Sequence, residues 1–249
     1  MNTLVRFRQV DKRFANGTLA LQGFELTLGG GQLTSLLGPS GCGKSTALRL
    51  IAGLEQTSAG TLEGSLQKHE LGYVFQEPTL MPWATVADNV SLPLRLRNTE
   101  KTAIRIKVDD ALQKVGLGDF ASAYPRQLSG GMKMRASIAR ALVTQPRVLL
   151  MDEPFAALDE ITRSKLNTDL LALRAQENLS IVFVTHSVYE SVFLSDRVVV
   201  LSDRPGRVIG EVVIGKKEPR DELFRTSALY GTLCREVSAL LQLNESPHV

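Results

Sequence analysis

The sequence predicts an α/β fold with a mostly parallel central sheet, an N-terminal antiparallel β portion and an inserted α-helical subdomain. Segments with strand character alternate with segments of helical spacing, which is typical of parallel sheets. Residues 148–151 and 181–185 are almost wholly apolar, as strands buried on both faces are. Residues 88–142 show helical patterns without strand patterns. We therefore expect one domain, in which a helical subdomain at 88–142 interrupts a core formed by 1–87 and 143–249.

The individual elements follow from local side-chain patterns. Alternating or continuous apolar runs predict strands over residues 4–10, 20–28, 33–37, 61–66, 71–75, 148–151, 181–185, 198–201 and 207–214. Apolar residues at helical spacing predict helices over residues 44–52, 101–115, 131–143, 161–175 and 221–243. Gly53 and Gly116 follow predicted helices, and Ser129 precedes one, so we expect these residues to be helix caps. Asn16-Gly17 is a turn signal between the first two strands.

The composition is that of an ordinary globular protein. Hydrophobic residues make up 43% and charged residues 22% of the 249, and the net charge is +3. The two cysteines and three histidines show no metal-binding spacing, so neither a disulfide framework nor a zinc site is expected. No run of roughly 18 apolar residues occurs. We therefore expect a cytoplasmic protein that cannot itself form a path through a membrane.

A glycine-rich loop follows the strand predicted at 33–37 and leads into the helix predicted at 44–52. Its residues are Gly38, Pro39, Ser40, Gly41, Cys42, Gly43, Lys44 and Ser45, and they match G-x-x-x-x-G-K-[ST]. Glycines let successive backbone N–H groups converge on one phosphate, towards which the helix also points its positive end. Lys44 would reach the β- and γ-phosphates, Ser45 would ligate Mg²⁺, and Thr46 would add a hydroxyl near the α-phosphate. The loop predicts a nucleoside triphosphate site.

Cys42 lies inside this loop, for which we weigh two interpretations. If its side chain faces solvent, the positive surroundings favour the thiolate, and bound MgATP would protect it from alkylation. Alternatively, Cys42 points back into the core as a small apolar residue.

Polar residues follow three of the predicted strands. Asp152 and Glu153 come after the apolar strand at 148–151, His186 follows the strand at 181–185, and Gln76 follows the strand at 71–75. Ligands of parallel α/β sheets bind at the carboxyl ends of the strands. Asp152 would hold Mg²⁺, and Glu153 would activate the attacking water as a general base. His186 would contact the γ-phosphate, unless it is a core histidine, and Gln76 would contact Mg²⁺ or the water.

Read together with Leu128-Ser129-Gly130-Gly131-Met132, these motifs resemble the ATPase domain of ABC transporters. The phosphate loop defines only the wider P-loop class, whereas the Leu-Ser-Gly-Gly segment distinguishes ABC ATPases. The resemblance runs from about residue 5 to about residue 213. It implies a P-loop NTPase core, ATP hydrolysis, and ATP and Mg²⁺ as cofactors. Met132 stands where the family has glutamine, which leaves the phosphate contacts intact.

The resemblance also assigns roles to single residues. Phe14 matches the aromatic residue that stacks on adenine, although a core position at the strand end is the alternative. Gln76 matches the Q-loop glutamine, and His186 matches the switch histidine. Ser129, Gly130 and Gly131 match the signature that caps the γ-phosphate of ATP held by a second subunit. Asp159, in Ala157-Leu158-Asp159, matches the D-loop at the dimer interface.

Partners are implied in the same way. The composite ATP site implies a dimer, formed with an identical or a related chain. In the family, a coupling helix of the membrane permease docks at the position of Leu80, Met81 and Trp83. Alternatively, these side chains form a small hydrophobic cluster that fills the space under a loop. A solute-binding protein would act indirectly, and no nucleic acid is expected. The chain would lie peripherally on the inner face of the cell membrane.

Three features suggest which subgroup of ABC transporters the chain resembles: Pro82-Trp83, Met132 in the signature, and Arg204-Pro205-Gly206. These features look most similar to bacterial importers of nitrate, sulfonates, taurine and pyrimidine thiamine precursors. A non-transport ABC ATPase is the alternative, but the sequence holds one cassette and no heptad insert. An ordinary P-loop kinase or GTPase is disfavoured by the Leu-Ser-Gly-Gly segment and His186. The transported solute is not encoded by these residues.

Overall fold

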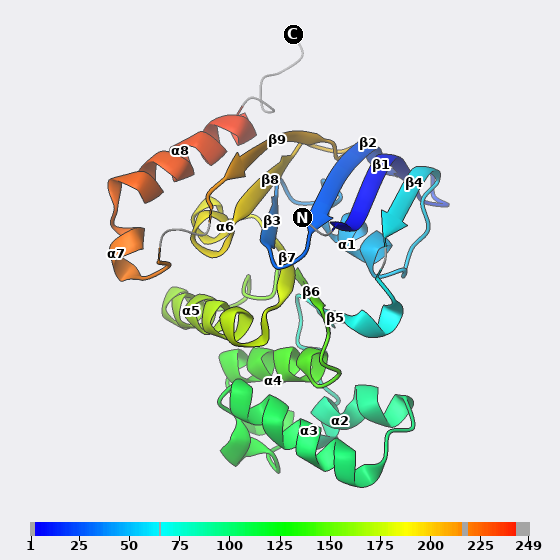
Figure 1. The fold of residues 1–249 in the computed structure, drawn as a ribbon, viewed down its shortest axis with the longest axis vertical. Helices are drawn as coiled ribbons and strands as arrows, with labels where there is room; N and C mark the ends of the chain where they lie inside the picture. The colour runs from blue at the N-terminus through cyan, green and yellow to red at the C-terminus, as the bar shows by residue number, and fades with distance from the viewer. Residues whose placement is uncertain (1–2, 65, 216–218, 243–249) are drawn as a thin grey trace. The chain divides into compact units, whose positions relative to one another are not determined.

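A computed structural model describes residues 3–64, 66–215 and 219–242 (Figure 1). Two positions of expected elements lie outside these ranges: Ser65 in one expected strand and Leu243 in the expected last helix. The chain forms two compact units. Unit 1 comprises Met1–Lys68 and Ser180–Val249, and unit 2 comprises His69–Leu179.

Unit 1 contains the antiparallel β portion that the sequence predicts. Strands β1 (Thr3–Arg13), β2 (Leu19–Gly29) and β4 (Ala59–Gly64) pair antiparallel in the order β2-β1-β4. The Phe7 and Phe24 rings, from β1 and β2, pack edge to face with centroids 5.1 Å apart. Gly17 makes the turn between these strands with φ of 84°, a conformation that suits glycine.

Parallel strands form the second part of unit 1. Strands β7 (Ser180–Thr185), β3 (Leu33–Leu37) and β8 (Arg197–Leu201) run parallel in that order, and β9 (Val208–Val213) pairs antiparallel with β8. Every residue of β3 and β7 is buried, which explains their apolar sequences. Helix α6 (Val188–Leu194) packs against β3, β7 and β8, and α1 (Lys44–Ile51) contacts β7 and β2.

The predicted single helix at the end of the chain is wrong. The structure has α7 (Glu222–Arg225) and then α8 (Ala228–Gln242), which packs against α6, β8 and β9. Ser227 separates them: its hydroxyl donates to Phe224 O at 2.8 Å and accepts from Tyr230 N at 3.1 Å. One serine therefore closes the first helix and caps the second, a local competition that the apolar spacing does not show.

Unit 2 combines a parallel strand pair with four helices. Strand β5 (Leu71–Val74) pairs in parallel with β6 (Val148–Asp152). The helices are α2 (Val86–Leu96), α3 (Lys101–Lys114), α4 (Gly130–Leu142) and α5 (Glu160–Glu177), and the short 3-10 turns are η1 (Lys68–Glu70), η2 (Gly118–Phe120) and η3 (Pro125–Gln127). Helices α2, α3 and α4 pack against one another, and α4 also contacts β5 and α5.

Helix α2 was not among the predicted helices, although its stretch of sequence has helical character. It contains Pro93, which lacks the backbone N–H that a helix interior uses. Thr85 caps it by accepting a hydrogen bond from Asp88 N at 3.1 Å. The predicted caps of other helices are confirmed: Gly53 and Gly116 adopt φ of 65° and 69°, and Ser129 caps α4.

In the described part of the chain, no helix has both the length and the apolar character that crossing a bilayer requires. The α/β class, the antiparallel N-terminal portion and the parallel strands are as the sequence predicts.

Candidate nucleotide site

The glycine-rich loop of unit 1 connects β3 to α1, as predicted. Gly41 and Gly43 have φ of 75° and 108°, values that other residues rarely adopt. At Gly43, an added Cβ would lie 2.7 Å from Ala20 O and from a methyl group of Leu21, so only glycine fits. The loop thus curls at the N-terminus of α1, the geometry in which backbone N–H groups bind a phosphate.

Lys44 is almost fully buried, with 4% of its surface exposed. Its ammonium donates hydrogen bonds of 2.8 Å to the carbonyl oxygens of both Gly38 and Pro39. The cation is therefore held against the beginning of the same loop. Ser45 is half-buried and Thr46 is buried in the first turn of α1, while Ser40 is exposed.

Cys42 does not face solvent, so the expected exposed thiolate is wrong and the core alternative is right. The side chain is only 1% exposed. Burial raises the pKa of the Cys42 thiol, and this outweighs the lowering by the Lys44 charge and by a backbone hydrogen bond. Its sulfur packs against Gly38, where an added Cβ would lie 3.0 Å from Sγ. The backbone N–H of Cys42 donates to Pro39 O at 3.3 Å.

The two acidic residues of unit 2 differ in their backbone. Asp152 ends β6, is 8% exposed, and accepts a hydrogen bond from the Tyr73 hydroxyl at 3.3 Å. Glu153 leaves the strand with φ of 45°, which is strained for a glutamate. Such strain persists only where the surrounding structure enforces it. Strained residues are common at functional sites.

Gln76 is exposed and opens the segment that joins β5 to α2. Two residues that the sequence analysis missed hold this segment in place. The buried Asn89 side chain accepts from Met81 N at 2.7 Å and donates to Thr85 O at 2.9 Å, with further bonds to Met81 O and Ala84 O. Arg140 of α4 donates to Pro78 O at 2.8 Å. Most of their partners are backbone atoms, which no sequence pattern marks.

Within this segment the three predicted docking residues differ in exposure. Leu80 and Met81 are half-buried, whereas Trp83 is 75% exposed. A plug that fills an internal gap would bury its largest side chain, so the exposure of Trp83 disfavours that alternative.

The signature residues of unit 2 begin α4. Ser129 is the N-cap, and its hydroxyl accepts from Met132 N at 3.3 Å. An added Cβ would lie 2.8 Å from Thr162 Cγ2 at Gly131 and 3.3 Å from Leu158 Cδ2 at Gly130, so α4 and the start of α5 pack closely here. The glycines allow this approach and leave the helix N-terminus accessible.

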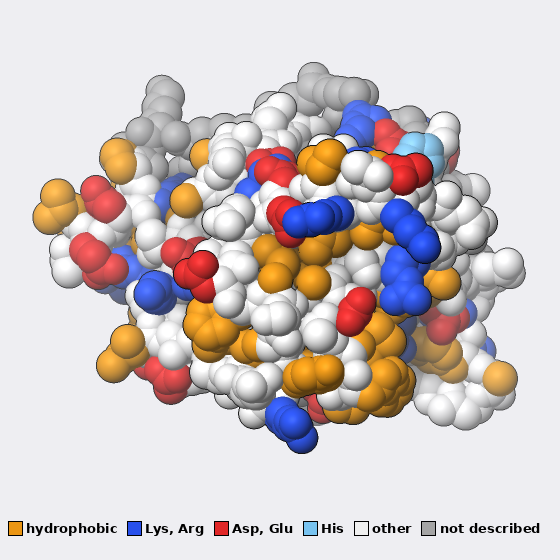
Figure 2. Space-filling model, turned by 90° about the horizontal axis from the view of Figure 1, so that it is seen from below, with side chains coloured by type: hydrophobic (Ala, Val, Ile, Leu, Met, Phe, Trp, Pro, Cys, Tyr) orange, Lys and Arg blue, Asp and Glu red, His pale blue; other side chains and the backbone are white. Residues whose placement is uncertain are grey.

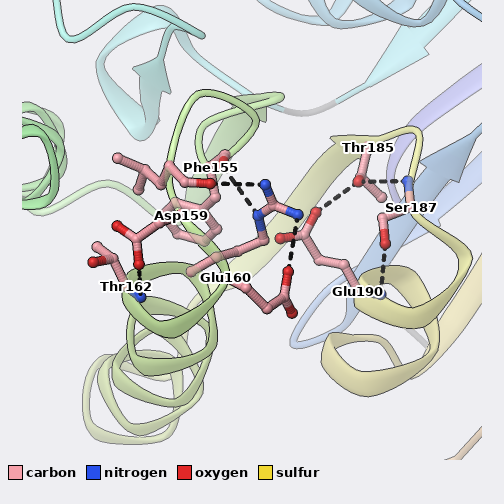
Figure 3. Close-up of polar contacts among 9 residues, drawn as sticks. Phe155, Asp159, Glu160, Thr162, Thr185, Ser187 and Glu190 are labelled. Carbon is pink, nitrogen blue, oxygen red and sulfur yellow. Dashed lines mark hydrogen bonds and ion pairs between the residues drawn. The ribbon is translucent and has the colours of Figure 1, made fainter.

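Asp159 is an exposed residue that caps α5 (Figure 3). Its carboxylate accepts a hydrogen bond from Thr162 N at 2.9 Å, and this bond lowers the pKa of Asp159. Capping thus accounts for an aspartate at this position, and the exposed carboxylate edge remains on the surface.

His186 follows β7 directly and is exposed, so the core-histidine alternative is wrong. The turn that presents it is fixed on both sides (Figure 3). The Thr185 hydroxyl donates to Glu190 at 2.6 Å and accepts from Ser187 N at 3.0 Å. The Ser187 hydroxyl accepts from Glu190 N at 3.3 Å and caps α6.

Phe14 lies just beyond β1 and is half-exposed, which disfavours a core position. The Lys12 ammonium lies 5.0 Å from the centroid of its ring and forms an ion pair with Glu55 at 2.7 Å.

The predicted site residues divide between the two units. Unit 1 contains Phe14, the loop at 38–46 and His186, and unit 2 contains Gln76, the signature residues 129–131, Asp152, Glu153 and Asp159. Among the described residues, no three or more His, Cys, Asp or Glu side chains form a metal-binding cluster. A Mg²⁺ ion bound to a nucleotide needs only a few oxygen ligands from the protein, because phosphate oxygens supply others. The side chains of Ser45, Gln76 and Asp152 carry oxygen groups of this kind.

The comparisons with known proteins all point to the same family. Residues 21–156 match the profile of the ABC transporter family. The aliphatic sulfonates import ATP-binding protein SsuB 1 of Pseudomonas syringae is 46% identical over 88% of this chain and 89% of its own length. An uncharacterized ABC transporter ATP-binding protein of Methanocaldococcus jannaschii is 48% identical over 83% of this chain and 79% of its own.

Solved structures of similar fold include CbiO1 from Clostridium perfringens, part of the transporter complex CbiONQ. It has a TM-score of 0.79 and 26% identity, over 98% of this chain and 99% of that one. The ATP-binding cassette MJ0796, a dimer in a post-hydrolysis state bound to ADP and phosphate, has a TM-score of 0.75 and 31% identity. That match covers 86% of this chain and 100% of the cassette.

Proposed function

Because this chain belongs to the ABC transporter family, as an ATP-binding subunit that hydrolyses ATP, we propose that it powers a bacterial importer of a small anion, a sulfonate or a pyrimidine-like solute. ATP binding is supported mainly by the loop of unit 1. Its glycines adopt left-handed backbone conformations, and Lys44 donates two hydrogen bonds to its carbonyl oxygens. The solute class is supported by the similarity to a sulfonate import protein.

In this proposal the phosphates of ATP bind to the loop. Backbone N–H groups of the loop, such as those of Gly41 and Gly43, and the N-terminus of α1 face the phosphate oxygens. Lys44 exchanges its carbonyl partners for the β- and γ-phosphates. Thr46 contacts the α-phosphate. Phe14, half-exposed beyond β1, stacks on the adenine ring.

Magnesium fits the donor groups assigned to it. The Ser45 hydroxyl, the Gln76 amide oxygen and the Asp152 carboxylate are hard oxygen ligands, which Mg²⁺ prefers. When bound, Mg²⁺ supplies positive charge to the phosphate oxygens. Glu153 accepts a proton from the attacking water as a general base. Its strained backbone, with φ of 45°, supports a functional role at this position. His186 donates to the γ-phosphate and orients Glu153.

The complete ATP site requires two chains. Ser129, Gly130 and Gly131 of one chain contact the γ-phosphate of the ATP bound by the other, through a hydroxyl and N–H groups at the start of α4. Asp159 lies at the same interface. The dimeric cassette with ADP and phosphate supports this arrangement. A second copy of this chain serves as partner, and a single chain binds ATP but hydrolyses it slowly.

A membrane permease docks on unit 2 near Leu80, Met81 and Trp83, beside the helical subdomain at 88–142. Figure 2 shows one face of the molecule, on which hydrophobic side chains gather among charged ones. Apolar surface of this kind favours a protein partner over bulk water. The chain then sits peripherally at the cytoplasmic face of the membrane, and a solute-binding protein delivers the cargo to the permease.

Phosphate release by the purified chain, alone and reconstituted with its permease, tests this function. We expect turnover of ATP by the wild-type chain and only background release by Lys44→Ala. Solute import into vesicles should require the wild-type chain and ATP. A wild-type chain that hydrolyses ATP but never associates with a permease would instead support the non-transport ABC ATPase.

A further inference from the structure

We propose that Arg204 is a positioning residue of the phosphate loop, which holds the Gly41 carbonyl outwards and adds positive charge beside the bound β-phosphate. This inference rests on the proposed ATP site. The Arg204 Nε donates a hydrogen bond of 3.0 Å to Gly41 O. The same guanidinium lies so close that a Cβ added at Gly41 would be 2.7 Å from Arg204 Nη2.

The contact matters because of where Gly41 lies. Its φ of 75° and its missing Cβ make the peptide that follows it easy to rotate. A rotated peptide would turn the Gly41 carbonyl oxygen, a negative dipole end, towards the space that an anion needs. Arg204 bonds this oxygen from the outside. The other end of the same peptide, the Cys42 N–H, donates to Pro39 O at 3.3 Å. The two bonds together hold this peptide and keep its carbonyl oxygen from turning towards the phosphates.

Arg204 is presented by a turn whose own bonds fix it to the rest of unit 1. The Ser202 hydroxyl accepts from Arg207 N at 2.9 Å and donates to Pro205 O at 3.1 Å. Gly206 N donates to Ala20 O at 2.9 Å, and Gly206 O accepts from Gln22 N at 3.2 Å. The turn therefore joins β8 to β9 and is also anchored to β2.

The turn also approaches the loop too closely for any side chain at Gly206. An added Cβ there would lie 2.1 Å from Cys42 O. The turn and the loop are thus in contact at two successive residues, Gly41 and Cys42. Arg204 itself is exposed, so its charge lies on the solvent side of the loop, where it attracts the phosphates without being buried.

Arg207 provides a matched control on the same turn. It is also an exposed arginine, but its guanidinium bonds the side chain of Gln22 instead of the loop. Replacing either arginine removes one positive charge from the same surface region. Only the replacement of Arg204 removes the bond to Gly41.

The test measures ATP and ADP binding by calorimetry, together with kcat and KM for hydrolysis, on full-length variants. Arg204→Ala should raise the Kd of both nucleotides and the KM of ATP roughly tenfold, the effect of losing one charge-assisted contact. Saturated kcat should stay within about twofold, because the reacting groups are untouched. Arg204→Lys, which keeps the charge, should recover most of the affinity, and Arg207→Ala should resemble the wild type.

Equal Kd values for Arg204→Ala and Arg207→Ala would overturn the proposal, and so would a loss of kcat with unchanged binding. If Arg204→Ala fails to fold, Arg204→Lys and Arg204→Gln decide. We expect Arg204→Gln to bind ATP several-fold more weakly than Arg204→Lys does, and equal affinities contradict the proposal. A wild-type chain that does not bind ATP would instead refute the proposed function, independently of Arg204.

Discussion

The guanidinium of Arg140 donates hydrogen bonds of 2.8 Å to both the backbone carbonyl oxygen and the side-chain hydroxyl of Thr79. Arg140 lies near the end of α4, the helix that begins with the signature glycines, and Thr79 lies between Gln76 and Trp83. Within unit 2, one arginine thus links the signature helix to the proposed docking segment. Thr79 has φ of 47°, so the bonds also help to hold a strained turn.

Arg140→Met should therefore destabilise the chain by about 2 kcal/mol, since it leaves several carbonyl groups without their charged donor. It should also weaken capture of the permease. Urea unfolding and a pull-down measure the two effects. Arg97→Met, which removes an exposed arginine of the same unit, is the control and should change neither. Wild-type stability of Arg140→Met would contradict the bracing role.

Trp83→Ala should reduce association with the permease while leaving ATP affinity unchanged. Trp83 is 75% exposed, and large exposed aromatic residues commonly anchor interfaces. The loss should be at least tenfold in Kd if Trp83 is such an anchor. Leu96→Ala, at a site that is 76% exposed in α2, is the matched control. If ATP affinity falls while permease binding is normal, the docking assignment is wrong.

Glu153→Gln should retain ATP binding and slow hydrolysis ~10²–10⁴-fold, the usual cost of losing a general base. The amide has the size of the carboxylate but cannot take a proton at neutral pH. Because ATP then persists, the variant should accumulate as an ATP-bound dimer, which light scattering detects. Glu177→Gln, which alters the partner of Lys114 at the far end of α5, should hydrolyse ATP normally. Turnover close to wild type in Glu153→Gln would remove this residue from the chemistry.

Cys42 should react slowly with maleimide at pH 7, both with and without MgATP. Its pKa is raised by burial, so at any pH below that pKa the folded chain holds less thiolate than a free cysteine does. The alkylation rate should therefore rise as the pH increases past 9, the ordinary cysteine value. Mass spectrometry of labelled peptides follows it, with denatured protein as the fast-reacting control. Rapid labelling of the folded chain at neutral pH would show that the thiol is exposed.

The strands and the phosphate loop were predictable because their sequence signals are local. Strand β3 spans 33–37 as expected, and Gly43 carries both the motif and the left-handed backbone. The orientation of Cys42 was harder to predict, since it depends on how the loop backbone turns. Asn89 and Arg140 left no signal, because they bond mainly backbone groups, which every position of the chain offers. The break at Ser227 was hidden by apolar residues that continue on both sides of it.

The central claim is that ATP is hydrolysed at a site completed by a second chain, and mixing two inactive variants tests it most directly. Lys44→Ala lacks the loop cation, and Ser129→Arg blocks the signature. Each should release phosphate only at background rates. In a mixed dimer, the intact loop of the Ser129→Arg chain meets the intact signature of the Lys44→Ala chain, so phosphate release should recover to a substantial fraction of the wild-type rate. A mixture that stays at background, or a Ser129→Arg chain that hydrolyses ATP normally by itself, would contradict the account.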